Sequence, residues 1–277
     1  MINKSRILTG PAPRAAPVAE MPLSRYYSPM SDFALRPLVV GGVSTNCWVV
    51  PLDDSGKTRA GEAETGQAGT GQAGTGQAGI GQAAVIDPGD RADRIIARLR
   101  ELNCAPAFIL LSHGHFDHLA ALVDLLAAFG PEGGQTAPLV AIHEDDGSYL
   151  GEGAYEVHAA SFRAAAGDAS FVDNLWKPLP AASRLLKDGD RVGPFTVLHL
   201  PGHTPGSAAF YWEERNLLFT GDTLFAGGYG RTDLPGGSAE RLAASLSRLL
   251  SMDGGAGVFP GHGETTTIGR ERRYYSG

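Results

Sequence analysis

Six consecutive residues of this chain carry four side chains that can bind a metal ion. Residues 113–118 read His-Gly-His-Phe-Asp-His, so three imidazoles and one carboxylate lie close together in the sequence. Imidazole and carboxylate ligands suit Zn²⁺, Fe²⁺ or Mn²⁺. The apolar run 108–111 precedes the cluster, and such a run is typical of a buried strand. We therefore predict a metal site whose ligands are held at the end of a rigid strand.

Three later segments repeat this arrangement, because in each a strand-like run is followed by glycine and then by histidine or aspartate. Glycine beside a ligand lets the backbone turn sharply and approach an ion closely. All four segments together supply five histidines and two aspartates, which are too many for one catalytic ion but suit two ions that share a carboxylate. The candidate metal ligands are His113, His115, Asp117, His118, His203, Asp222 and His262, and Asp117 is also the candidate catalytic residue.

The two cysteines of the chain do not form a metal-binding motif. Cys47 and Cys104 lie in separate predicted elements and outside any C-x-x-C pair, so a thiolate zinc site has no support. Two reduced thiols are the simpler interpretation. Because the candidate ligands include no thiolate, a closed structural zinc site is also disfavoured.

Strands and helices alternate along the sequence, which indicates a layered α/β fold. Short apolar or β-branched runs predict strands at 46–50, 84–87, 108–111, 139–142, 195–200, 208–212, 217–220 and 257–259. Apolar residues at helical spacing predict helices over 91–103, over 119–129 and over 239–250. The predicted strands end directly before the candidate ligands, so this fold could position them.

Three further stretches complete the predicted organisation. Residues 1–32 are rich in proline and alanine and are expected to form a poorly ordered arm before a single domain over 33–277. Residues 53–83 include a repeated Thr-Gly-Gln-Ala-Gly unit, which predicts a flexible loop enlarged between two strands of a hairpin. Residues 144–184 lack a clear period and are expected to form a helical, partly exposed insertion near the active site.

Composition excludes several classes of partner. The net charge is −7 and no basic run is present, so nucleic acid is not an expected partner. No apolar stretch approaches the ~20 residues needed to span a membrane, and no hydrophobic segment typical of a secretion signal follows Lys4 and Arg6. We expect a cytoplasmic protein with a small-molecule substrate, and we find no signal for its oligomeric state.

The seven candidate ligands, in this order and spacing, resemble the metallo-β-lactamase superfamily over nearly all of residues 33–270. Within it, segments 202–207 (Gly-His-Thr-Pro-Gly-Ser) and 221–233 resemble the glyoxalase II, or hydroxyacylglutathione hydrolase, group. The resemblance implies a four-layer αββα sandwich with the metal site at one edge, between the two sheets. It also implies one ion held by His113, His115 and His203, a second held by Asp117, His118 and His262, and Asp222 as the bridge.

The same resemblance implies a metal-dependent hydrolase that cleaves a thioester of the acyl-glutathione type with a metal-activated hydroxide. Its cofactors would be two divalent ions, most simply zinc, with iron or manganese as alternatives. Tyr229 and Arg231 are the candidate substrate contacts, although Arg231 and Asp233 could instead form an ion pair that only stabilises their loop. Asp87 ends a predicted strand and would orient a ligand histidine from behind.

Departures from the glyoxalase II pattern leave the substrate open. Typical members carry a C-terminal helical domain that binds glutathione, whereas this chain ends about 15 residues after His262, so the shorter single-domain relatives are closer. The arginines of residues 270–273 would either replace that domain in part or form a solvated tail.

Two other activities fit the resemblance. A persulfide dioxygenase would bind one iron through His113, His203 and Asp222. A lactonase is the second alternative. A count of bound metal separates the dioxygenase from the hydrolase.

Three further histidines are not candidate ligands. We expect His143 in a loop or behind the ligands, His158 exposed on a helix, and His199 in the core or at the edge of a strand.

Overall fold

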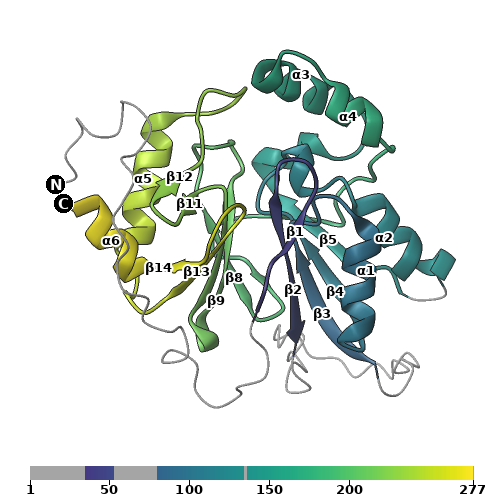
Figure 1. Cartoon of the computed structure of the whole chain (residues 1–277), viewed down its shortest axis with the longest axis horizontal. Helices are drawn as coiled ribbons and strands as arrows, with labels where there is room; N and C mark the ends of the chain where they lie inside the picture. The colour runs from purple at the N-terminus through teal and green to yellow at the C-terminus, as the bar shows by residue number, and fades with distance from the viewer. Residues whose placement is uncertain (1–34, 53–79, 134–135, 277) are drawn as a thin grey trace, which may run out of the picture.

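Two sheets packed face to face form the centre of the molecule, and helices cover their outer faces (Figure 1). The computed structural model describes residues 35–52, 80–133 and 136–276. The predicted arm 1–32 and residues 53–79 of the predicted loop lie outside these residues.

The first sheet contains six strands in sequence order. Strands β3 to β6 run parallel, whereas β1 and β2 are antiparallel to their neighbours. Because parallel strands end at the same edge of a sheet, β3, β4 and β5 deliver the residues that follow them to one edge. The strands are β1 (Leu38–Val40), β2 (Thr45–Leu52), β3 (Gly81–Ile86), β4 (Cys104–Leu110), β5 (Leu139–His143) and β6 (Arg184–Leu186).

The second sheet also contains six strands, in the order β14-β13-β10-β9-β8-β7. Its central strands β10 and β13 run parallel, and the other pairs are antiparallel. The strands are β7 (Arg191–Val192), β8 (Phe195–His199), β9 (Ala208–Trp212), β10 (Leu217–Gly221), β13 (Gly257–Pro260) and β14 (Thr266–Thr267), and a separate small hairpin pairs β11 (Leu224–Phe225) with β12 (Gly228–Tyr229).

Two helices cover each sheet, and one helical segment lies between β5 and β6. Helices α1 (Ala92–Glu101) and α2 (Leu122–Phe129) cover the first sheet, and α5 (Ala239–Leu250) and α6 (Ile268–Ser276) cover the second (Figure 1). Helices α3 (Ala154–Ala166) and α4 (Ser170–Leu175) belong to the predicted insertion 144–184. Short 3₁₀ helices occur at Phe116–His118, Pro131–Gly133, Glu144–Tyr149 and Glu213–Arg215.

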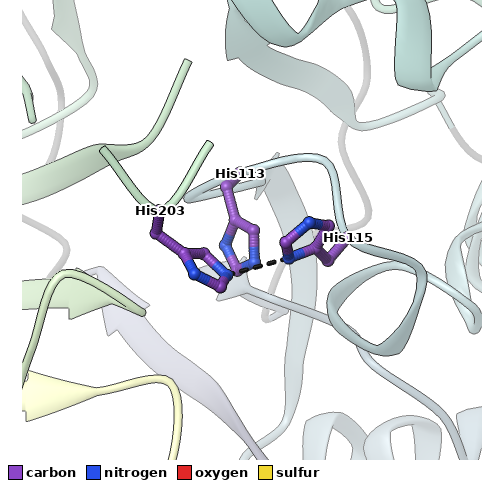
Figure 2. Close-up of side chains that lie close together, drawn as sticks. All are labelled: His113, His115 and His203. Atoms are coloured by element: carbon purple, nitrogen blue, oxygen red, sulfur yellow. Dashed lines mark hydrogen bonds between the residues drawn. The ribbon is translucent and has the colours of Figure 1, made fainter. Parts of the chain in front are cut away.

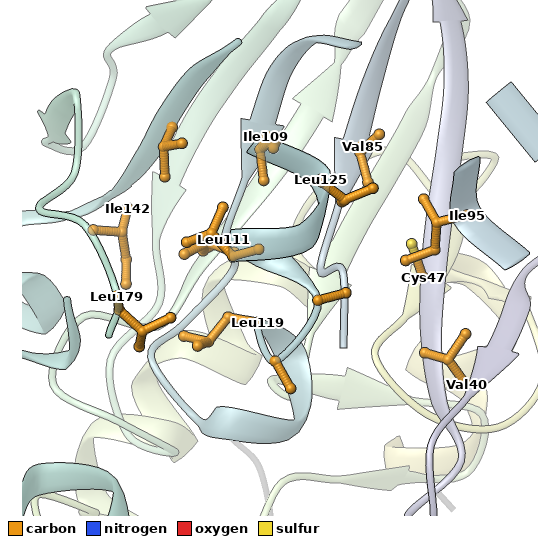
Figure 3. Close-up of a cluster of buried hydrophobic side chains, with 14 of the residues drawn as sticks. Val40, Cys47, Val85, Ile95, Ile109, Leu111, Leu119, Leu125, Ile142 and Leu179 are labelled. Atoms are coloured by element: carbon orange, nitrogen blue, oxygen red, sulfur yellow. The ribbon is translucent and has the colours of Figure 1, made fainter. Parts of the chain in front are cut away.

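Alternating side chains of the first sheet build two separate cores. Along β2, Cys47 and Val49 pack toward α1 and α2, in the cluster that Figure 3 shows with Ile95 and Leu125. Trp48 and Val50 point to the opposite face, where the second sheet adds Phe195, Phe210, Phe219 and Phe259. A third cluster joins the second sheet to α5 and α6. Since successive strand residues face opposite sides, this arrangement confirms the αββα sandwich.

The structure corrects several predicted boundaries. Strand β3 begins at Gly81, so residues 81–83 of the predicted loop are strand, paired to β4, and residues 82–83 pair with β2 as well. Strand β4 begins at Cys104 rather than 108, and its register shifts at Pro106, a residue that has no amide hydrogen to donate. The two- and three-residue strands were not predicted, because such short segments show no period, and the nine-residue helix α6 was not predicted either.

Candidate metal centre

All seven candidate ligands come together, although they follow four different strands. The cluster 113–118 follows β4, and the other three ligands follow β8, β10 and β13. Their ligand atoms form three overlapping groups, each within 4.8 Å: His113, His115 and His203; Asp117, His118 and His262; and His113 and His118 with Asp222. We call His113, His115 and His203 the first ligand group, and Asp117, His118 and His262 the second ligand group.

The first ligand group consists of three buried imidazoles. One ring nitrogen from each lies within 4.8 Å of the others. Figure 2 shows the three rings turned toward one another. Nδ1 of His115 lies 2.8 Å from Nε2 of His203. Two ring nitrogens this close cannot both carry a hydrogen, so at least one presents a lone pair to this space.

The second ligand group combines one carboxylate with two imidazoles, again with ligand atoms within 4.8 Å of one another. Nε2 of His118 lies 3.3 Å from Oδ2 of Asp117 and 3.3 Å from Nε2 of His262. The hydroxyl of Thr45 donates to Oδ2 of Asp117 at 2.9 Å and thereby fixes this carboxylate.

Asp222 lies between the two groups. Its Oδ1 is 3.4 Å from Nε2 of His118, and its Oδ2 is 3.6 Å from Nε2 of His203 and 3.5 Å from Nε2 of His262. One carboxylate therefore contacts members of both groups, which is the placement that a bridging ligand requires.

Two glycines next to the ligands are required because neighbouring side chains approach their backbone closely. A Cβ atom at Gly261 would lie 2.2 Å from Oδ1 of Asp222, and one at Gly221 would lie 2.2 Å from the hydroxyl oxygen of Ser112. Gly221 also has a φ of +48°, which other residues adopt rarely. The strand–glycine–ligand pattern of the sequence thus has a steric cause at these two positions.

Asp87 and Ser112 fix the ring orientation of two ligands. The Ser112 hydroxyl donates to Oδ2 of Asp87 at 2.7 Å and lies 3.0 Å from Nδ1 of His113, so it accepts from that ring. Oδ2 of Asp87 also lies 3.1 Å from Nδ1 of His118. Both rings therefore present Nε2 as the metal-binding atom, and Asp87 lies behind the ligands as expected.

Main-chain carbonyls orient two further ligands. Nδ1 of His203 donates to the carbonyl oxygen of Arg231 at 2.7 Å, and Nδ1 of His262 donates to that of Ser44 at 3.2 Å. Sequence reasoning missed both contacts, because any residue type can supply a carbonyl oxygen.

Burial and neighbouring charges set the protonation of the site. Burial holds the pKa of His113 and of His115 well below the usual range, so both rings are neutral. For Asp117, burial acts to raise the pKa, but His118 and His262 outweigh it and hold the pKa well below its ordinary value. For His118, burial acts to lower the pKa, but Asp117 and Asp222 outweigh it and raise the pKa well above 6.5. A cation bound here would displace that proton.

The residues present fit a metal ion. Nε2 of His113 and Oδ1 of Asp222 are buried and have no hydrogen-bond partner within the protein. A buried polar atom without a partner costs about 1–3 kcal/mol, and an ion would supply the missing interaction. Imidazole and carboxylate donors without thiolate suit Zn²⁺, Fe²⁺ or Mn²⁺.

The two candidate substrate residues lie in and after the β11–β12 hairpin. Phe225 of this hairpin contacts His262, with ring centroids 6.1 Å apart, and the Tyr229 ring lies 6.3 Å from that of Tyr275. Arg231 is exposed, and its guanidinium makes a two-point ion pair with Asp233, at 2.7 and 2.6 Å. The Arg231 side chain therefore makes the ion pair with Asp233 that the sequence predicts as the alternative to substrate contact.

The prediction that His158 is exposed was wrong. Its ring is fully buried against Phe116, Tyr149 and Trp176, and its Nε2 donates to the carbonyl oxygen of Tyr149 at 2.8 Å. Burial lowers its pKa to about 4. Residues of the insertion 144–184, such as His158 and Trp176, therefore pack onto Phe116, which lies between the ligands His115 and Asp117 in the sequence.

A second histidine cluster lies apart from these two groups. His143 and His199 stack with centroids 3.8 Å apart and planes 14° apart, beside Asp145. Nδ1 of His143 accepts from the Asp145 amide, and Nε2 of His199 donates to the carbonyl oxygen of Pro205. Because these nitrogens are engaged and the rings are parallel, we assign no ion to them.

Asp87→Asn should weaken metal binding without changing the ligands. The amide replaces one acceptor oxygen with a donor, so contacts with Ser112 and His118 cannot all persist. We expect a loss of about 10- to 100-fold in zinc affinity, measured by competition with a chromophoric chelator. Unchanged affinity in this variant would contradict an orienting role for Asp87, and Asp93→Asn, at an exposed carboxylate on α1, serves as the control.

None of the helices among the described residues is both long enough and apolar enough to cross a membrane.

Known proteins share both the sequence pattern and the architecture. The family model of the metallo-beta-lactamase superfamily matches residues 78–262. Hydroxyacylglutathione hydrolase GloC of Haemophilus influenzae is 41% identical over 192 residues, which are 69% of this chain and 84% of that protein.

Two solved structures have the same fold. The crystal structure of TTHA1623 in a di-iron-bound form is 34% identical, with a TM-score of 0.63 and coverage of 87% of this chain and 98% of that one. BLEG-1 B3 metallo-beta-lactamase is 28% identical, with a TM-score of 0.64 and coverage of 86% and 96%.

Proposed function

The chain belongs to the metallo-β-lactamase superfamily, and from this premise we propose that it is a metal-dependent hydrolase that cleaves thioesters of the acyl-glutathione type. The observation that carries the proposal is the convergence of both ligand groups on Asp222. The similarity to the hydroxyacylglutathione hydrolase of Haemophilus influenzae supports the choice of substrate class.

We propose that the cofactor is a pair of divalent ions, most simply zinc, with iron or manganese as alternatives. The first ligand group would hold one ion, the second group would hold the other, and Asp222 would bridge them. That a relative was crystallised in a di-iron-bound form supports a count of two. Such ions lower the pKa of a bound water to ~7 and polarise a substrate carbonyl.

The protein itself would supply orientation and charge. The Thr45 hydroxyl fixes the Asp117 carboxylate, which stays ionised and can accept a hydrogen bond from the attacking water. This is the catalytic role that we propose for Asp117 beside its role as a ligand. A thiolate is a good leaving group, so this reaction needs no dedicated general acid, which suits a site whose polar side chains are nearly all ligands.

We propose that the substrate is a small molecule held near the β11–β12 hairpin. Phe225 places this hairpin against His262, so a substrate at the second ligand group would lie close to it. Tyr229 and Arg231 remain the proposed substrate contacts, and we propose no nucleic-acid or membrane partner and a cytoplasmic location.

Hydrolysis of S-lactoylglutathione by the metal-loaded protein tests the substrate class. We expect release of glutathione, followed with a thiol reagent, at a kcat/KM well above that for a lactone or a β-lactam. A protein that opens lactones but leaves the thioester intact would contradict the proposal and favour the lactonase. The His115→Ala variant, loaded in parallel, corrects for hydrolysis by free metal.

A further inference from the structure

A buried carboxylate outside the ligand set connects the two loops that carry the first ligand group. Asp146 lies in the 3₁₀ turn after β5, and its side chain is fully buried. Its Oδ2 accepts from the Gly114 amide at 2.8 Å and from the Thr204 hydroxyl at 2.7 Å, and its Oδ1 accepts from the Gly206 amide at 2.7 Å.

These three donors are placed directly beside the ligands. Gly114 stands between His113 and His115, and Thr204 follows His203 in the chain. One loop follows a strand of the first sheet and the other follows a strand of the second sheet. One carboxylate therefore links two loops that belong to separate sheets, beside the hydrogen bond that the Ala208 amide donates to the Ser112 carbonyl oxygen at 2.7 Å.

At Gly114 and Gly206 the two loops approach the 3₁₀ segment 144–149 too closely for any side chain to fit. A Cβ atom at Gly206 would lie 2.6 Å from the Asp146 amide nitrogen, and one at Gly114 would lie 2.1 Å from Cγ of Tyr149. Both loops are thus packed directly against the same 3₁₀ segment, 144–149.

We propose that Asp146 is a positioning residue of the metal centre, which sets the distance between His115 and His203 by binding the backbone beside each of them. This inference rests on the proposed metal centre but not on the identity of the substrate. A ligand must lie within a few tenths of an ångström of its ideal distance to bind zinc, and three short hydrogen bonds to one rigid group supply that control.

Asp146→Asn is the sharpest variant because it keeps the shape of the side chain. Whichever way the amide is turned, its NH₂ group must face the amide hydrogen of Gly114 or of Gly206, so at least one hydrogen bond is replaced by a contact between two donors. Asp145→Asn is the matched control, since Asp145 is the preceding residue and is 48% exposed.

The test measures zinc affinity in two single-site backgrounds. His262→Ala removes a ligand of the second group and leaves the first, and His115→Ala does the reverse. In the His262→Ala background we expect Asp146→Asn to weaken zinc binding about 10- to 100-fold. In the His115→Ala background we expect Asp146→Asn to change zinc affinity by no more than about twofold. Asp145→Asn should leave zinc affinity unchanged in both backgrounds.

A merely structural role would give a different pattern. Equal weakening in both backgrounds, or no weakening in the His262→Ala background, would overturn the proposal. If Asp146→Asn does not fold, Thr204→Val removes one donor to the same carboxylate, and the same selectivity is required of it. Absence of thioester hydrolysis would refute the proposed function and leave this result untouched.

Discussion

Asp222→Ala should remove most of the hydrolytic activity and lower the number of bound ions per chain. The Asp222 carboxylate contacts His203 of the first ligand group and both histidines of the second, so its loss affects both ions at once. The fall in kcat/KM should exceed the ~10- to 100-fold typical of residues behind the ligands, since a shared ligand is lost. Steady-state thioester kinetics and metal analysis of the same sample measure the two effects.

The control for this variant is Asp93→Asn. The Asp93 carboxylate is exposed and pairs with Arg91, on the face of the first sheet that points away from the second sheet. This variant should keep normal kinetics and metal content. Near-normal turnover in Asp222→Ala would mean that the two ions do not share this carboxylate, and the two-metal account would fail.

Removal of metal with a chelator should abolish hydrolysis and lower the melting temperature. Without ions, Nε2 of His113 and Oδ1 of Asp222 are left buried without a hydrogen-bond partner. A ligand present at 100 times its dissociation constant stabilises the folded state by about 2.7 kcal/mol, so the shift should be easily measured by thermal unfolding. Added Zn²⁺ should restore both activity and melting temperature.

The double variant His115→Ala, His262→Ala gives the matching control, because it removes one ligand from each group. Its melting temperature should respond much less to chelator and to added zinc. Thioester hydrolysis that persists after complete removal of metal would contradict the proposed mechanism.

The convergence of the seven candidate ligands could be predicted from the sequence because each of them carries a local signal. His203, Asp222 and His262 each follow glycine at the end of an apolar strand, and Gly221 and Gly261 prove to lie in steric contact with the site. Asp87 has the same signal, an acidic residue at the end of a buried strand. The alternation of strands and helices along the sequence likewise predicted the layered fold, in which Cys47 and Trp48 face different cores.

What could not be predicted depends on contacts between distant segments. Asp146 follows two other acidic residues and reads as part of an exposed turn, yet only Asp146 is buried, because the two ligand loops close over it. His158 was misplaced for a similar reason, since Phe116 and Trp176 bury it from outside its helix. The carbonyl of Arg231 that orients His203 belongs to the backbone, so the residue type at that position does not predict the contact.

Metal content is the most direct test of the central claim, that two ions share one carboxylate. The measurement is metal per chain in protein purified without added metal, with oxygen consumption and thioester hydrolysis followed on the same sample. We predict about two divalent ions per chain, hydrolysis of S-lactoylglutathione and no oxygen uptake. A single iron per chain, with oxygen uptake on a persulfide substrate and no thioester hydrolysis, would contradict the account and favour the dioxygenase.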